Sequence, residues 1–241
     1  MDSEPTKIAL MVVDVQYDFL PPTGALPVPG GCDILPVINR LLDHNLNWSL
    51  VVASADSHPY NHISFASSHG LKPFNQLKLS NSKVIDLWPD HCIRGTKGSE
   101  IEFGVQRALD KFLELELDVV VYKKGEDINK EEYSAFRDKG IDGLTEQLKY
   151  YGINNLVIVG LASEYCVYAT AKSALERGFR VYWVKDGTAA VGGLKAQNEV
   201  EQRLLKDYGV DAFRLVDLET ILSILKKVPD PNDFYCSNFV L

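Results

Sequence analysis

The stretch LVIVGLASEYCVYATAKSALER, residues 156–177, predicts a buried strand that turns directly into a helix. The apolar run 156–159 ends at a glycine, as a buried parallel strand and its exit turn would. Ser163 is the expected N-cap of the helix, and Glu164 suits the positive end of its dipole. Cys166 then falls in the first turn, where unpaired backbone N–H groups favour a thiolate. This position can make the thiol a nucleophile, although a free cysteine taken alone more often only packs in a core.

Short β-branched runs alternate with amphipathic helical patterns along most of the chain. This alternation is typical of a parallel sheet that is covered on both faces. We therefore predict the α/β class, with a three-layer α/β/α fold and a six-stranded, mainly parallel sheet. The expected strands are residues 8–13, 50–53, 119–122, 156–159, 181–184 and 212–216, and the expected helices are residues 34–46, 100–113, 144–151, 164–177, 196–208 and 218–226.

The length of the chain favours one domain, which we place at residues 1–228. A chain of 241 residues with 46% hydrophobic content can bury one substantial core. The connection at about 57–98 is rich in His, Ser, Asn and Pro and is too long for an ordinary loop, so it indicates a functional insertion with ligands and a lid. Residues 229–241 form a separate tail with two prolines, whose aromatic candidates for docking on the body or on a second subunit are Phe234, Tyr235 and Phe239.

Composition and charge argue against several classes of function. The net charge of -8 and the pI near 5.2 oppose binding to nucleic acid. No apolar run approaches the roughly 20 residues that a membrane span needs. The four cysteines lie far apart, and nothing before Ile8 resembles a secretory signal. We expect a soluble intracellular protein of the cytoplasm, with the nucleus as a second compartment, that acts on a small molecule.

Four reactive side chains follow four of the predicted strands. Asp14, Asp56 and Lys124 each come at the end of a strand, and Cys166 follows the fourth. In an open parallel sheet, ligands bind outside the carboxyl ends of the strands. Each side chain alone has a structural explanation, because a carboxylate can cap a turn and a lysine can be solvated. Together they predict a chemical site at one edge of the sheet.

Asp14, Lys124 and Cys166 are the expected catalytic triad. Asp14 follows an apolar run, so its charge needs a partner at the edge of the core, and Lys124 can supply one. The carboxylate can accept the proton of the thiol, while the lysine keeps it ionised and stabilises developing negative charge. The adjacent Lys123 is a rival, but in a strand its side chain points to the opposite face.

A carboxylate and several imidazoles predict a metal site beside the triad. Asp56 and His58 stand at i and i+2, so in an extended chain both project to one face. His91, in a segment flanked by Trp and Pro, is preferred as the third ligand over His62 and His69. An Asp/His/His set fits Zn²⁺, Fe²⁺ or Mn²⁺ with open positions for water or substrate. Each histidine taken alone has a surface or packing role as its alternative.

Six ordered motifs cover residues 8 to about 216 and carry a family resemblance. They are VVDVQYDF at 12–19, GALPVPGG at 24–31, DSHPYNHISFA at 56–66, LWPDHCIRGTKGS at 87–99, KKGEDINKEEYSAF at 123–136 and GLASEYCVYATA at 160–171. In these motifs the chain resembles the nicotinamidases of the isochorismatase-like cysteine hydrolase superfamily, most closely the fungal type. The resemblance implies hydrolysis of nicotinamide to nicotinate and ammonia through a cysteine thioester, in NAD salvage.

The resemblance also implies roles for the residues of the triad and its surroundings. Asp14 matches the general base of the family, Lys124 its triad lysine and Cys166 its nucleophile. The N–H groups of Ala162 and Cys166 would hold the oxyanion. The family has a cis peptide before the residue that matches Ala162, so we expect a cis bond between Leu161 and Ala162.

Metal and substrate contacts follow from the same resemblance. It implies one divalent metal ion, usually zinc with iron or manganese as alternatives, which Asp56, His58 and His91 would bind. Ser64 matches a residue near the metal that contacts it through water. Relatives form dimers and larger assemblies, so the resemblance leaves a homo-oligomer open. The residues expected to contact the nicotinamide are Phe19, Gln16 and Tyr133.

Two departures from the family pattern and three rival functions stay open. Fungal relatives commonly have an aromatic residue where Ser57 stands, and segment 70–86 matches poorly, so the aromatic residue that stacks on the ring is not identified; Phe74 is a candidate. One rival is another cysteine amidase of the superfamily with a carbamoyl or ureido substrate, whose relatives generally lack the metal set. A vinyl-ether hydrolase would not need the cysteine. The third rival is a non-catalytic binding module.

Overall fold

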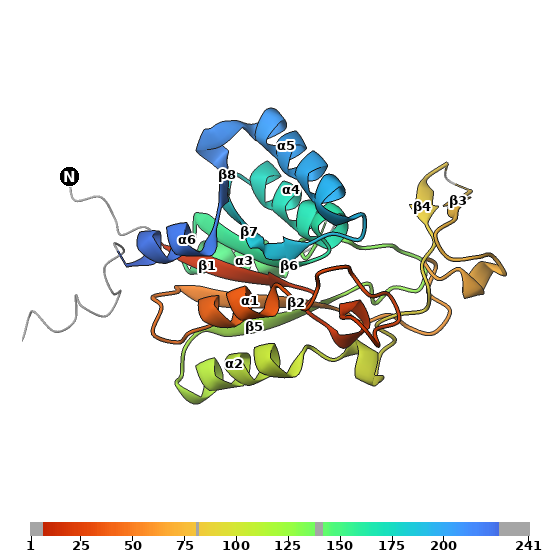
Figure 1. The fold of residues 1–241 in the computed structure, drawn as a ribbon, viewed down its shortest axis with the longest axis horizontal. Coiled ribbons are helices and arrows are strands. Elements are labelled where there is room, and N and C mark those ends of the chain that lie inside the picture. Colours follow the sequence, from red (N-terminus) through yellow and green to blue (C-terminus); the bar gives the residue numbers. More distant parts are fainter. Residues whose placement is uncertain (1–6, 81, 138–141, 227–241) are drawn as a thin grey trace, which may run out of the picture.

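A computed structural model describes residues 7–80, 82–137 and 142–226 (Figure 1). In these residues, six parallel strands form the central sheet in the order β5-β2-β1-β6-β7-β8. The predicted α/β class and the six-stranded sheet are confirmed. The strands are β1 (Ile8–Val13), β2 (Leu50–Asp56), β5 (Val119–Lys124), β6 (Asn155–Leu161), β7 (Arg180–Ala189) and β8 (Phe213–Val216).

Helices cover both faces of the sheet and give the predicted three layers (Figure 1). Both faces of the sheet need a cover because both are hydrophobic. In strand β1, for example, the side chains alternate between two hydrophobic cores. Ile8, Leu10 and Val12 pack with the helices of one face, and the residues between them pack with the helices of the other. The first face carries α1 (Leu35–Leu41), α2 (Phe103–Glu114) and α6 (Leu218–Leu225), and the second carries α3 (Gly143–Tyr150), α4 (Tyr168–Glu176) and α5 (Gly193–Ala212).

Several elements differ in extent from the sequence prediction. Helix α1 ends at Leu41, five residues before the predicted end at 46, and β2 continues to Asp56, three residues beyond the predicted end at 53. Strand β7 continues beyond the apolar run 181–184 to Ala189, because its pairing with β6 resumes after an irregularity and ends at Leu161. Helix α5 is longer than expected at both ends and contains Gly209 with non-helical backbone angles. Neither extension shows a hydrophobic period, so the pattern of apolar residues could not indicate it.

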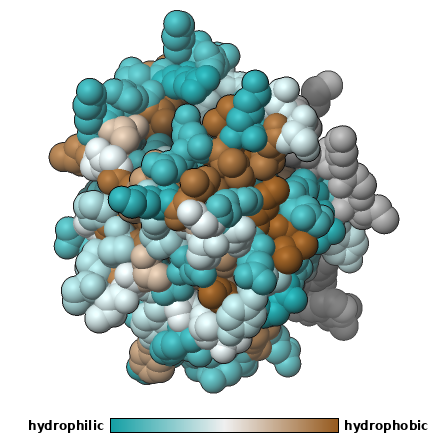
Figure 2. Space-filling view, turned by 90° about the vertical axis from the view of Figure 1, so that its right-hand side faces the viewer, coloured by the Kyte–Doolittle hydropathy of each residue, from teal (hydrophilic) through white to brown (hydrophobic). Residues whose placement is uncertain are grey.

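The expected insertion leaves the sheet after β2 and contains a hairpin that the sequence did not indicate. Its strands β3 (Gln76–Lys78) and β4 (Val84–Asp86) pair antiparallel. Ala66, Ile85 and Leu87 form a small core of their own under this hairpin. Figure 2 views the molecule from this end, and hydrophobic residues gather in part of a mostly hydrophilic face. Short 3-10 helices at Tyr17–Phe19, Ser67–His69 and Lys97–Ser99 complete the connections around it.

Several predictions about the chain ends fall outside the described residues. The tail 229–241, with its three aromatic residues, is among them, and the domain boundary at 228 stays a prediction. No helix in the described part of the chain is long and apolar enough to cross a membrane.

Candidate active site

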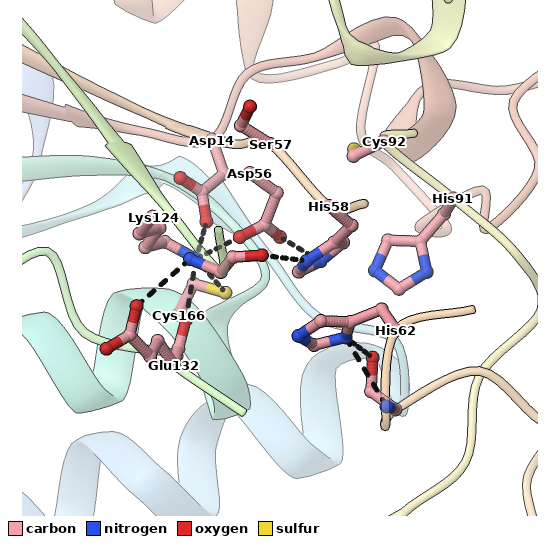
Figure 3. A network of polar contacts seen from close by, with 12 residues as sticks. Asp14, Asp56, Ser57, His58, His62, His91, Cys92, Lys124, Glu132 and Cys166 are labelled. Atoms are coloured by element: carbon pink, nitrogen blue, oxygen red, sulfur yellow. Dashed lines mark hydrogen bonds and ion pairs between the residues drawn. The ribbon is translucent and has the colours of Figure 1, made fainter. Parts of the chain in front are cut away.

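The four reactive side chains of the sequence analysis meet at one edge of the sheet (Figure 3). Strands β5, β2, β1 and β6 are neighbours, so their carboxyl ends lie side by side. Asp56 and Lys124 are paired directly across β2 and β5. Asp14 follows β1, and Cys166 lies in the first turn after β6. All four side chains are buried.

Lys124 is the centre of this cluster. Its Nζ lies 2.8 Å from Oδ2 of Asp14 and 3.3 Å from Sγ of Cys166. It also donates a hydrogen bond of 2.6 Å to Oδ1 of Asp56, which the sequence analysis did not predict. The structure therefore brings together the three residues of the expected triad and connects them to the metal-type ligand Asp56.

Burial and the lysine set the protonation of the triad. Burial raises the pKa of the Cys166 thiol well above its usual range, and the charge of Lys124 only partly opposes this effect. The pKa of this thiol is therefore raised despite its position at the start of a helix. Burial also raises the pKa of Asp14, which makes its carboxylate a stronger base toward the thiol. Lys124 keeps its charge because Asp14 and Asp56 outweigh the cost of its burial and raise its pKa.

Ser54 holds the carboxylate of Asp14 from the other side. Its hydroxyl donates a 2.7 Å hydrogen bond to Oδ1 of Asp14, so Ser54 and Lys124 each bind one oxygen. Asp14 itself has a φ of 50°, an uncommon value for a residue other than glycine. Ser54 was missed in the sequence analysis, although it stands two residues before Asp56 and thus on the same face of β2.

The turn that carries the nucleophile begins with the cis peptide bond that the sequence predicts between Leu161 and Ala162. The first turn, Ser163–Val167, is π-helical, and the α-helix continues from Tyr168. The N-cap is Ala162, not Ser163, and no side chain caps the turn. The expectation for Ser163 is therefore wrong, because its hydroxyl is buried and has no hydrogen-bond partner among the described residues.

Replacing Ser163 by alanine tests this correction. A serine N-cap contributes about 1 kcal/mol to stability. A buried hydroxyl without a partner carries only a desolvation cost. We therefore expect Ser163→Ala to leave the free energy of unfolding unchanged or slightly higher in urea denaturation. A loss of about 1 kcal/mol or more would restore the capping role.

Asp56, His58 and His91 form a buried group whose ligand atoms all lie within 4.8 Å of one another. Nδ1 of His58 donates to the carbonyl oxygen of Gly125 at 2.9 Å, and Nδ1 of His91 donates to that of Pro89 at 2.7 Å. A carbonyl oxygen only accepts, so each ring has a proton on Nδ1, which leaves Nε2 as the atom that can face a metal. Nε2 of His58 lies 3.6 Å from Oδ2 of Asp56. The donor set therefore fits a divalent ion.

Backbone geometry and charge support this fit. Gly125 approaches the ring of His58 so closely that a Cβ there would lie 2.3 Å from Cε1. Burial lowers the pKa of His91 to about 4, which favours the neutral imidazole. Burial also works to lower the pKa of His58, but the neighbouring Asp56 outweighs it and raises this pKa. Burial works to raise the pKa of Asp56, but Lys124 and His58 outweigh it and hold the pKa below its usual range. A neutral imidazole and an ionised carboxylate are the forms that bind metals.

The other two candidate histidines, His62 and His69, make polar contacts within the protein. Nδ1 of His62 lies 2.7 Å from the hydroxyl of Ser64, and its Nε2 lies 3.0 Å from the carbonyl oxygen of Lys130. The His62 ring stacks on that of His58 with centroids 4.2 Å apart. His69 contacts the carbonyl oxygen of Ile63. Ser64 therefore contacts His62, whose ring stacks on that of His58. Its expected contact with a metal through water stays a prediction.

A mainly apolar pocket opens in front of Cys166 and His91. Trp88 is one of its walls, and its indole N–H donates a 3.2 Å hydrogen bond to the hydroxyl of Tyr133. Trp88 also meets the ring of Tyr165 edge-on at 4.8 Å. Trp88 and Tyr165 were missed as pocket walls, although both stand in motifs that the sequence analysis quotes. The lining residues are Phe19, Leu26, Val28, Asp56, Trp88, His91, Glu131, Tyr133, Ala162, Tyr165, Cys166 and Val191.

Some of the residues expected to contact the substrate line the pocket, and others do not. Phe19 and Tyr133 line the pocket, as predicted. Gln16 is fully buried, and its amide binds the backbone N–H and C=O of Asp56 at 2.8 Å each, so it holds Asp56 and does not line the pocket. Phe74 is 65% exposed and touches Trp88 with centroids 6.0 Å apart, and it is not a wall either. Trp88 is the aromatic residue of the insertion that faces the pocket.

One family model matches most of the chain. It describes the isochorismatase domain and covers residues 8–204. The chain belongs to the isochorismatase family. This confirms the superfamily to which the six motifs of the sequence point.

Similar isochorismatase-family proteins extend over most of this chain. The nicotinamidase of Escherichia coli (strain K12) is 37% identical over 187 residues, which are 76% of this chain and 83% of that protein. The structure of the yeast nicotinamidase bound to the inhibitor nicotinaldehyde has a TM-score of 0.76 at 30% identity and covers 87% of this chain and 99% of that one. The pyrazinamidase of Pyrococcus horikoshii in complex with zinc has a TM-score of 0.65 at 32% identity, with coverages of 88% and 99%.

Proposed function

We propose that this isochorismatase-family protein is a nicotinamidase that hydrolyses nicotinamide to nicotinate and ammonia, in NAD salvage. The observation that carries the proposal is the contact of Lys124 with both Asp14 and Cys166, because Cys166 lines a pocket with aromatic walls. A flat pyridine ring fits between aromatic walls such as Phe19 and Tyr133. The similarity to nicotinamidases from a bacterium and from yeast supports the same substrate.

The first half of the reaction forms a thioester on Cys166. Asp14 takes the proton of the thiol, and Sγ attacks the carboxamide carbon of nicotinamide. Lys124 stabilises the negative charge as it develops on sulfur. The N–H groups of Ala162 and Cys166 hold the oxyanion. The C–N bond then breaks, and protonated Asp14 gives its proton to the leaving nitrogen, which departs as ammonia.

The second half releases nicotinate. Asp14, ionised again, takes a proton from an attacking water. The carbon–sulfur bond breaks, protonated Asp14 returns its proton to the sulfur of Cys166, and the acid product loses its remaining proton to solvent and leaves as nicotinate. The same oxyanion-binding N–H groups serve both halves, because both pass through a tetrahedral oxyanion.

Asp56, His58 and His91 are the residues that would bind a divalent metal, and we propose zinc. The support is their buried convergence and the zinc of the pyrazinamidase with a similar structure. When bound, the ion would supply a Lewis acid that orients the ring through its pyridine nitrogen. Iron and manganese are the alternatives for the same donor set.

His91→Ala tests the metal site independently of turnover. His91 supplies one of three ligands, so the affinity loss should exceed the roughly 10- to 100-fold that losing an outer partner costs. Mass spectrometry of the metal content after dialysis measures the effect. His44→Ala, at an exposed histidine, is the matched control and should retain the metal of the wild type. Equal metal content in both variants would contradict the assignment.

Ammonia release tests the proposed activity against its rivals. We expect the metal-replete protein to release ammonia from nicotinamide and to lose this activity with a chelator. Full activity of a metal-free protein on carbamoyl or ureido compounds would favour the rival amidase. No release from nicotinamide or from a panel of small amides would favour a binding module. The cytoplasmic address and the formation of homo-oligomers stay predictions from the sequence.

A further inference from the structure

Glu164 lies two residues before the nucleophile, and the proposed mechanism gives it no task. The sequence analysis assigned it to the helix dipole. In the structure, its carboxylate turns instead to the connection between β7 and α5. Oε1 accepts a 2.7 Å hydrogen bond from the N–H of Gly192, and Oε2 accepts one of 3.2 Å from the N–H of Val191. Both carboxylate oxygens of Glu164 therefore accept hydrogen bonds from one short backbone segment.

Within the described part of the chain, few hydrogen bonds other than those to Glu164 hold this segment. Gly193 has a φ of 68°, and its N–H donates to the carbonyl oxygen of Ala190 at 3.1 Å. Two successive glycines leave a backbone with much conformational freedom and no side chains to pack. A Cβ on Gly192 would lie 2.8 Å from Cβ of Ala196, so this position has no room for a side chain that could fix it. Among the described residues, the side chain of Val191 packs on the first hydrophobic core, and the carboxylate of Glu164 supplies the side-chain hydrogen bonds to the backbone of this segment.

Val191 connects this contact to the substrate. Its side chain lines the same pocket as Ala162 and Cys166. Glu164 belongs to the π-helical turn Ser163–Val167 that also carries Cys166. One carboxylate thus joins the Val191 wall of the pocket to the turn of the nucleophile.

We propose that Glu164 is a positioning residue that sets how tightly the ring of the substrate is bound. It holds Val191 at a fixed place relative to Cys166, and so fixes the width of the pocket at that wall. The inference rests on the proposed amidase function, because it concerns the fit of that substrate. Glu164 acts through Val191 and takes no part in proton transfer.

The hydrogen bonds of Glu164 predict the order in which substitutions should raise KM. Hydrogen bonds from N–H groups to a carboxylate are stronger than those to a neutral oxygen. In Glu164→Gln, one N–H keeps an acceptor, but the other faces the amide NH₂, which is itself a donor. Glu164→Ala removes both acceptors. The Michaelis constant KM for nicotinamide should therefore rise from wild type to Gln to Ala.

Steady-state kinetics give the first test. We expect KM of Glu164→Ala to rise roughly tenfold, which is about 1.4 kcal/mol of binding free energy. The turnover number kcat should stay within about threefold, because the triad is untouched. Glu176→Gln is the matched control, at an exposed glutamate of α4 paired with Lys172, and should leave KM unchanged. A purely structural role would lower the melting temperature and the yield of active protein but not raise KM.

Hydrogen–deuterium exchange gives a second test that needs no activity. In the free protein, the N–H groups of Val191 and Gly192 should exchange faster in Glu164→Ala than in wild type. Unchanged KM in Glu164→Ala, or unchanged exchange at these two residues, overturns the proposal. If the wild type releases no ammonia from nicotinamide, the proposed function fails, and the exchange experiment still decides whether Glu164 holds this segment.

Discussion

Cys166→Ala is expected to lower the turnover of nicotinamide by at least roughly 10⁴-fold, the scale on which losing a nucleophile affects hydrolases. Without Sγ no thioester can form, and Asp14 and Lys124 have no thiol proton to move. The metal site should survive, because Asp56, His58 and His91 come from other segments. Ammonia release and metal content of the same preparation measure both expectations.

A second cysteine provides the control for this variant. Cys32 is exposed, and its Sγ donates a 3.2 Å hydrogen bond to the carbonyl oxygen of Pro21. Cys32→Ala should retain the activity of the wild type. If Cys166→Ala kept more than about one hundredth of that activity, the covalent route would be wrong, because the residual rate expected without a nucleophile is far smaller.

Lys124→Met is expected to remove activity and also to destabilise the fold. Lys124 is the cation that pairs with both Asp14 and Asp56 in the buried cluster. Its loss leaves two buried carboxylates without their partner, which costs about 3–5 kcal/mol. Asp14 would then bind a proton more readily, and a protonated Asp14 cannot accept the proton of Cys166. Urea denaturation and ammonia release measure the two effects.

The neighbouring lysine separates this effect from a general loss of charge. Lys123 stands next to Lys124 on β5 but is exposed. Lys123→Met should change the free energy of unfolding by no more than about 0.5 kcal/mol, as surface substitutions usually do. Similar losses in both variants would contradict the role that we assign to Lys124. If Lys124→Met does not fold, Lys124→Arg retains the charge and should still lose turnover, because a planar guanidinium does not replace a compact ammonium in this cluster.

The reactive side chains at the strand ends of this protein were predictable from one feature of parallel sheets. The predicted strands begin as apolar runs, so the polar side chains that come just after each run mark the edge of the core. The rule does not choose between near neighbours such as Ser54 and Asp56, or Lys123 and Lys124. Asp14, Asp56 and Lys124 follow this rule, and Cys166 follows the exit turn of β6. The strand order β5-β2-β1-β6, which the sequence did not predict, makes these four side chains neighbours.

Other parts of the site depend on contacts that no periodic pattern shows. Trp88 belongs to the insertion and lines the pocket. The insertion contains the β3–β4 hairpin and a small hydrophobic core of its own, and neither follows from a periodic pattern. Ser163 looked like an N-cap, but the turn is π-helical and begins after Ala162, and the Ser163 hydroxyl has no hydrogen-bond partner among the described residues. Glu164 suited a helix dipole by its position, yet its partners Val191 and Gly192 are distant in sequence.

The central claim is that Cys166 attacks the carboxamide carbon of nicotinamide. Its most direct test is rapid acid quenching of the metal-replete protein during turnover, followed by mass spectrometry of its peptides. We predict one nicotinoyl group on the peptide that contains Cys166, formed and lost on the timescale of ammonia release. Sustained ammonia release with no nicotinoyl group on that peptide at any quench time would contradict the account.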